Sequence, residues 1–348
     1  MMFWKAPFHT IKLLLQKFQG EKIVTLHKFN TQLNKLCFGQ NDKKHKPVPL
    51  KESVLRDAAL PGKAIEKWTV FRLFPLMIGG FVPKDSPHWH LYLLLLNICD
   101  IILAPQIKLS WLGYLSSLIS EFLAELQLLF PGKFTPKTHY FVHYPRLIHE
   151  FGPLRAHWCI RFEAKHLYFK HLSSVVCNFQ NISLTLAKRY QMHQCYDIQK
   201  GTATAVAPDA CREVPLSKLQ ALKEVITSGD IPNETVWKTE KIVIDSTTYK
   251  VGDLFVLYVV HGEEVPIFVK VLHIVKYRGQ WLACGLIYTS THFEEHLHAY
   301  CVQNTRKWVA FKPGDEADFH PLDAYTDVND NLFITLHHKP LGHGVLED

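Results

Sequence analysis

Apolar residues in the first part of the chain recur with the spacing of an α-helix. Between residues 9 and 18, for example, Ile11, Leu14 and Phe18 share one helical face. Two later segments meet stop signals at Gly79-Gly80 and Pro131-Gly132. The pattern predicts helices over residues 9–18, 65–81, 88–104, 109–130 and 158–193.

From residue 241 onward the pattern changes to short runs of β-branched and aromatic residues separated by turn signals. Short strands at this spacing favour a small antiparallel β-barrel. Strands are predicted over residues 242–244, 253–260, 267–275, 281–288, 299–303, 308–311 and 331–337.

The two patterns together predict an α+β protein with two domains. A mostly helical domain covers residues 1–200, and a linker rich in alanine, threonine and proline covers residues 201–216. A short helix at 217–227 and the barrel make up residues 217–348.

Composition places the chain among intracellular globular proteins, nuclear or cytoplasmic. The eight cysteines include no CxxC pair, and no secretory leader is evident, so we expect no disulfide framework and no secretion. The two most apolar segments, 88–105 and 109–130, each contain polar or acidic residues. They are therefore expected to be buried helices, with no membrane partner.

Charge divides the chain more sharply than its net value of +7 suggests. Residues 1–200 hold 26 Lys+Arg and 12 Asp+Glu, a net charge of +14, whereas residues 201–348 carry −7. A basic half favours a polyanionic partner such as DNA, although lysines also solvate helical surfaces. The expected phosphate contacts are Lys43, Lys44, Lys46, Arg155, Arg161, Lys165, Lys170, Lys188 and Arg189.

An ordered set of motifs between residues 136 and 191 resembles the C-terminal part of the catalytic core of CACTA/EnSpm-type DNA transposases. The set comprises PKTHYFVHYP (136–145), FGPL (151–154), WCIRFEAKH (158–166) and NFQNISLTLAKRYQ (178–191). The segments FRLFPLMIGGFVP (71–83), with His88-Trp89 after it, and THFEEHLHAY (291–300) also fit that family.

The resemblance implies an RNase H-like enzyme in which three carboxylates hold two divalent metals, Mg²⁺ in a complete family member. By resemblance the third acid is Glu163, and the paired histidines that can share a zinc with a CxxC are His139 and His143. The residues themselves leave other readings open. Glu163 also fits an ion pair with Arg161, Lys165 or Lys170, and the histidines fit a hydrogen-bonded core pair.

The chain departs from the family where the first two catalytic aspartates are expected. No acid precedes Glu21, and the CxxC is missing. We therefore expect the C-terminal part of a transposase that lacks a complete catalytic centre and binds DNA without sequence preference. Two alternatives stay open: a protein- or chromatin-interaction module built on the barrel, and an active transposase subunit completed by an upstream segment.

Overall fold

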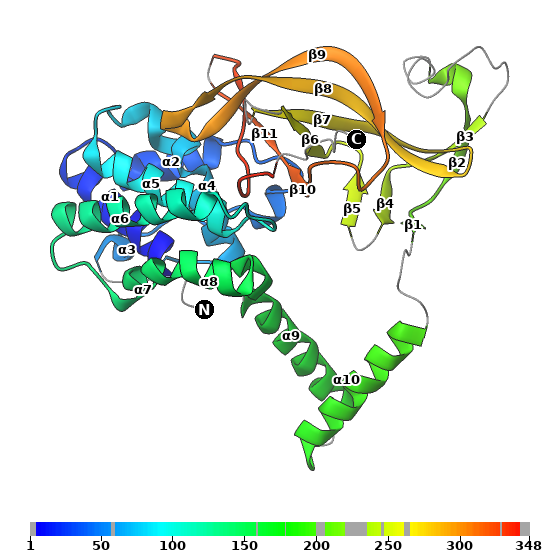
Figure 1. Cartoon of the computed structure of the whole chain (residues 1–348), viewed down its shortest axis with the longest axis horizontal. Coiled ribbons are helices and arrows are strands. Elements are labelled where there is room, and N and C mark those ends of the chain that lie inside the picture. The colour runs from blue at the N-terminus through cyan, green and yellow to red at the C-terminus, as the bar shows by residue number, and fades with distance from the viewer. Residues whose placement is uncertain are drawn as a thin grey trace.

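The computed structural model describes residues 5–56, 60–157, 159–177, 179–199, 206–219, 235–244, 247–260, 265–327 and 329–341. Helices gather on one side of the molecule and a curled antiparallel sheet lies beside them (Figure 1), which confirms the α+β fold class. The α-helices of these ranges are α1 (Lys5–Gly20), α2 (Leu26–Lys35), α3 (Glu52–Arg56), α4 (Ala64–Ile78), α5 (Pro87–Ile102), α6 (Trp111–Leu129), α7 (Pro136–His139), α8 (Tyr144–Phe151), α9 (Cys159–Val176) and α10 (Ile182–Gln199).

The helical body is organised around α4 and α5, which are buried along most of their length because both sequences are strongly apolar. Helix α5 begins at Pro87, whose fixed backbone angle suits the first helical position, and the Ser86 hydroxyl caps it by accepting the Trp89 N–H. The centroid of the Trp89 ring lies 5.9 Å from that of Phe74 and 5.2 Å from that of Tyr92. This aromatic cluster forms the centre of the body. No helix within the described ranges is both long and apolar enough to cross a bilayer.

Among the described residues the main sheet has nine strands, and its principal path runs β10-β6-β7-β8-β9-β12-β11 with every pair antiparallel. Register irregularities, which bend a strand and increase its twist, interrupt both the β7–β8 and the β8–β9 ladders. The sheet is a curled half-barrel, and full closure stays a prediction. Its strands are β2 (Arg212–Pro215), β3 (Thr235–Thr239), β6 (Leu254–Val260), β7 (Val265–Tyr277), β8 (Gln280–Glu294), β9 (Ala299–Phe311), β10 (Asp318–Leu322), β11 (Ala324–Thr326) and β12 (Leu332–Ile334).

A second, three-stranded sheet pairs β4 (Lys241–Ile244) with β1 (Ala207–Pro208) and β5 (Thr247–Lys250). Strands β1 and β2 both fall inside the predicted linker 201–216, so its described part belongs to the sheets. Cross-strand pairing with β3 and β4 outweighs the weak local signal of this stretch. Most of the predicted short helix at 217–227 lies outside the described residues; Leu216–Lys218 form a single 3₁₀ turn.

Two further predictions differ from the structure. The single helix predicted over 158–193 is two helices, because Cys177 and Asn181 adopt left-handed backbone angles (φ 50° and 54°) and reverse the chain between α9 and α10. The strands predicted at 299–303 and 308–311 are one continuous strand, β9.

The helical body and the sheet share contacts between segments far apart in sequence. The indole N–H of Trp89 donates to the carbonyl of His296 (3.0 Å), and a ring nitrogen of His298 lies 2.7 Å from the Asp100 carboxylate. Tyr325, from β11, belongs to the hydrophobic core of the helical body. The basic half of the sequence, residues 1–200, and the acidic half, residues 201–348, therefore pack against each other in space.

Candidate functional site

The α9–α10 hairpin extends away from the helical body and the sheet (Figure 1). Its two helices are held together by aromatic contacts. The ring centroid of Tyr190 in α10 lies 5.4 Å from that of Phe169 and 5.9 Å from that of Tyr168, both in α9. The ammonium group of Lys165 sits 4.9 Å from the Tyr190 ring centroid, a favourable cation–π distance. These contacts fix the spacing of the two helices.

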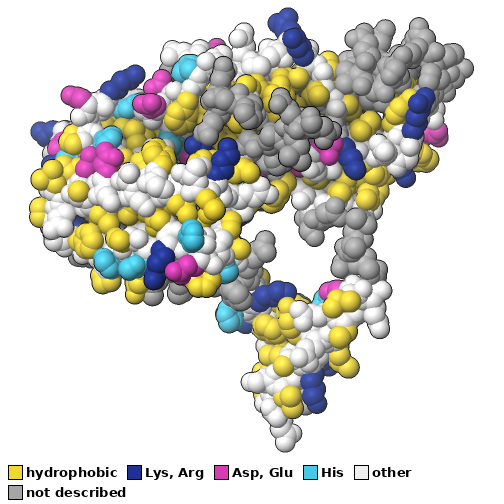
Figure 2. Space-filling model, in the orientation of Figure 1, with side chains coloured by type: hydrophobic (Ala, Val, Ile, Leu, Met, Phe, Trp, Pro, Cys, Tyr) yellow, Lys and Arg dark blue, Asp and Glu magenta, His cyan; other side chains and the backbone are white. Residues whose placement is uncertain are grey.

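The outer surface of this hairpin is both basic and apolar. Lys165, Lys170, Lys188 and Arg189 are all exposed. Large apolar side chains lie among them, including Leu167 (72% exposed), Met192 (72%) and Ile198 (76%). Figure 2 shows hydrophobic and basic side chains interspersed on this projecting part of the molecule. Such a surface offers charge for phosphates and flat apolar area for a base or a protein side chain.

The remaining expected phosphate contacts fall in different places. Lys43, Lys44 and Lys46 are exposed on and beside a 3₁₀ turn, Lys43–His45. Arg155 is half-buried and points inward, donating to the carbonyl of Leu103 (3.3 Å) and to the Nε2 atom of His320. Arg155 therefore links the helical body to the sheet, and we no longer expect it to contact phosphate.

Glu163 and Arg161 lie on the first two turns of α9, but their side chains are outside the described part of the structure. Whether Glu163 pairs with a neighbouring cation or faces another carboxylate thus stays a prediction. Lys165, one of its suggested partners, faces Tyr190.

His139 is the last residue of α7, and His143 ends the following 3₁₀ turn, Tyr140–His143. Their rings meet edge to face with centroids 5.3 Å apart. His139 is exposed and His143 half-buried, so they are not the core pair that the sequence left open. Among the described residues, neither group of three convergent metal-ligating side chains includes them.

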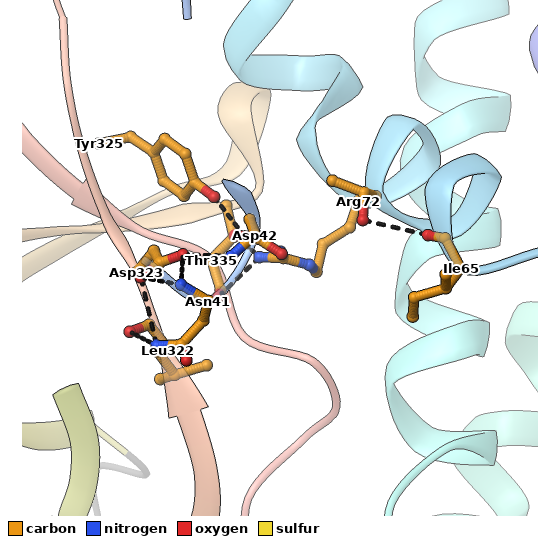
Figure 3. Close-up of polar contacts among 9 residues, drawn as sticks. Asn41, Asp42, Ile65, Arg72, Leu322, Asp323, Tyr325 and Thr335 are labelled. Atoms are coloured by element: carbon orange, nitrogen blue, oxygen red, sulfur yellow. Dashed lines mark hydrogen bonds and ion pairs between the residues drawn. The ribbon is translucent and has the colours of Figure 1, made fainter. Parts of the chain in front are cut away.

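A buried polar junction, which the sequence patterns did not point to, joins the loop after α2 to α4 and the sheet (Figure 3). The Arg72 guanidinium donates to the Asp42 carboxylate and to the Thr335 hydroxyl (2.5 Å), and the Tyr325 hydroxyl also donates to Asp42. Asp323 accepts the backbone N–H groups of Asn41 (3.1 Å) and Asp42 (2.7 Å). An arginine inside the apolar run FRLFPLMI was the available signal, because a buried charge requires a partner.

Electrostatics at the junction favours the ionised pair. Burial alone raises the pKa of Asp42, but the Arg72 guanidinium and the hydrogen bonds from Arg72 and Tyr325 outweigh it and hold this pKa at about 2. Burial lowers the pKa of Arg72, and the Asp42 carboxylate more than compensates, so that it lies above its usual value. Asp42 and Arg72 thus form a structural ion pair that stays charged at neutral pH.

The described residues also bring together two groups of three potential metal ligands. One comprises Asp318, His320 and His338, which are largely buried, and the other comprises His90, Glu121 and Glu125, on the surface of α5 and α6. Neither was expected from the sequence, because their members are separated by up to 35 residues with no ligand-spacing motif.

No family model, no curated protein and no solved structure matches this chain.

Proposed function

We propose that this protein binds nucleic acid through the α9–α10 hairpin, and that it derives from a CACTA/EnSpm-type transposase without a complete catalytic centre of its own. The observation that carries the proposal is the projecting hairpin with exposed basic and apolar side chains. In this reading the helical half corresponds to the transposase insertion and third-acid helix.

The charge balance of the hairpin supports a phosphate partner. Residues 159–199 carry five Lys+Arg and only two acids, Glu163 and Asp197. Asp197 lies 3.0 Å from the ring nitrogen of His193, so its carboxylate already has a neighbour on its own helix. Because the lysines and Arg189 extend from two paired helices rather than from a loop, they present a regularly spaced array of positive charge to a nucleic-acid backbone.

A charge-removal variant tests this assignment. Replacing Lys188 and Arg189 together with glutamine should keep α10 helical, because glutamine has a good helix propensity. Duplex DNA affinity, measured by fluorescence anisotropy across a salt series, should fall, and the slope of log K against log[salt] should become shallower by about 1.8, or 0.9 per lost phosphate contact. Binding should show little dependence on DNA sequence.

The matched control removes the same charge elsewhere. Lys307 and Lys312 are exposed on and just after β9, in the acidic half. Their double replacement with glutamine should leave affinity and salt slope unchanged. Equal losses in both double variants, or binding that ignores salt, would show that the hairpin is not the interface.

A second candidate function is recognition of a protein or chromatin partner through the sheet. A cavity of about 460 Å³ supports it, with a lining that includes Lys270, Tyr288 and Asp323. The third alternative, an active subunit completed by another segment, would use Glu163. Nicking of supercoiled DNA in Mg²⁺ that Glu163→Gln abolishes would favour that alternative; under our proposal the DNA stays intact.

A further inference from the structure

Strand β10 carries Asp318 and His320, two positions apart, on one face of the sheet edge. The backbone N–H of His320 donates to the Oδ1 atom of Asp318 (3.0 Å), which orients the carboxylate. The chain returns to this place after β12, where it contributes His338. Three side chains from two separate segments therefore converge on one point.

The distances among their ligand atoms approach those around a tetrahedral metal ion. The Nε2 atom of His338 lies 3.3 Å from Asp318 Oδ2 and 3.4 Å from His320 Nδ1. Bonds of about 2.0–2.1 Å from zinc to nitrogen or oxygen place neighbouring tetrahedral ligands about 3.3 Å apart. The other carboxylate oxygen, Asp318 Oδ1, lies 2.6 Å from His320 Nδ1, and this hydrogen bond has to break when a metal replaces the proton on Nδ1.

Burial and donor chemistry restrict the choice of ion. The side chains of Asp318 and His338 are each 2% exposed, and that of His320 is 20% exposed, so the carboxylate is almost removed from water. A buried carboxylate needs a compensating cation. Two imidazoles and one carboxylate suit Zn²⁺, whereas Mg²⁺ and Ca²⁺ prefer oxygen ligands.

Arg155 opposes metal binding at this place. Its guanidinium donates to Nε2 of His320, which leaves the proton of a neutral ring on Nδ1, directed at Asp318. A metal on Nδ1 moves that proton to Nε2, where it faces a donor group and a positive charge. Metal binding therefore requires the Arg155 side chain to turn away from His320.

We infer that Asp318, His320 and His338 form a zinc site that fastens residues 335–341 to the sheet. The same segment contacts the helical body, since the Lys339 N–H donates to the carbonyl of Asp100 (3.0 Å) and Leu341 packs against the helical core. Zinc at this position strengthens the connection between the two halves of the molecule. A water molecule completes the tetrahedron on the side where His320 is exposed.

The full-length protein, stripped of metal by a chelator, is titrated with Zn²⁺ and with Co²⁺ as a spectroscopic probe. We expect one equivalent of four-coordinate Co²⁺ without a thiolate absorption band, and a rise in Tm on zinc addition. Asp318→Asn, which keeps the shape of the side chain, should weaken Zn²⁺ binding at least 100-fold and abolish the rise in Tm. His320→Gln should also weaken Zn²⁺ binding and abolish the rise in Tm, and because His320 is more exposed than Asp318 this change disturbs packing less. Circular dichroism verifies that each variant is folded.

Two further variants distinguish this site from its competitors. His90→Gln disrupts the exposed His90–Glu121–Glu125 group and should leave zinc affinity unchanged. Arg155→Ala should raise affinity about tenfold by removing the competing cation, whereas loss of a purely structural contact would not. Three results with variants would overturn the inference: Asp318→Asn still binding one equivalent of metal, His90→Gln losing it, or Arg155→Ala binding zinc more weakly. A thiolate absorption band, or no metal binding by the wild type, would overturn it as well.

Discussion

Arg72→Met is expected to lower the free energy of unfolding by about 3–5 kcal/mol, the usual cost of leaving one member of a buried ion pair without its partner. The Arg72 side chain is 4% exposed and that of Asp42 is 9% exposed, so little solvent can replace the lost guanidinium. Methionine fills much of the same volume, which limits the contribution of an empty cavity. Urea unfolding followed by circular dichroism measures the change.

The double variant Asp42→Asn/Arg72→Met separates the ion pair from packing. It removes both charges, so it should be more stable than Arg72→Met alone. In the wild type the pKa of Asp42 is below its unfolded value of 3.8, so the pair's contribution is complete above pH 3.8 and is lost as pH falls toward 2. If the double variant were as unstable as the single one, the effect would come from packing and not from charge.

Gly285→Ala is the second change from which we expect a large effect, a loss of about 3 kcal/mol or failure to fold. A Cβ atom at Gly285 would lie 2.0 Å from the carbonyl oxygen and 2.7 Å from the carbonyl carbon of Lys270. Gly285 pairs with Val271, next to the irregularity that bends the β7–β8 ladder. Because the obstacle is backbone, the central ladder itself has to move.

Gly113→Ala is the matched control. A Cβ built at Gly113, which sits inside α6, would meet no atom within 4 Å apart from its chain neighbours and the nearby backbone of its own helix. Alanine there should stabilise the protein by about 0.5–1 kcal/mol through its better helix propensity. Thermal unfolding of both variants gives the comparison, and equal stability of Gly285→Ala and wild type would contradict the close approach of β7 and β8.

Local patterns predicted α5 and α6 well, because both helices combine a strongly apolar sequence with clear stop signals. The patterns did not predict β2, β3 or β10, whose residues are half-polar and become strands through pairing with distant partners. The left-handed turn at Cys177 and Asn181 was also missed, since neither residue is a glycine.

For the candidate sites, too, residues whose position depends on local pattern could be predicted and residues whose position depends on distant partners could not. Exposed lysines such as Lys170 and Lys188 could be identified from sequence, because charge on a helix usually faces solvent. The inward position of Arg155 could not, since it depends on His320, 165 residues away. Likewise, nothing in the sequence near Asp318 indicates that His338 returns beside it.

The pairing of Asp42 with Tyr325 spans 283 positions and has a consequence for synthesis of the protein. At about 5–20 residues per second, a ribosome takes about 15–60 s to pass from one partner to the other. Throughout that interval the nascent helices hold a charged loop and an apolar core that still lacks Tyr325 of β11. Helices made first therefore remain unfinished and exposed to aggregation until late in translation, which makes chaperone binding to the emerging chain an expected feature of its biogenesis.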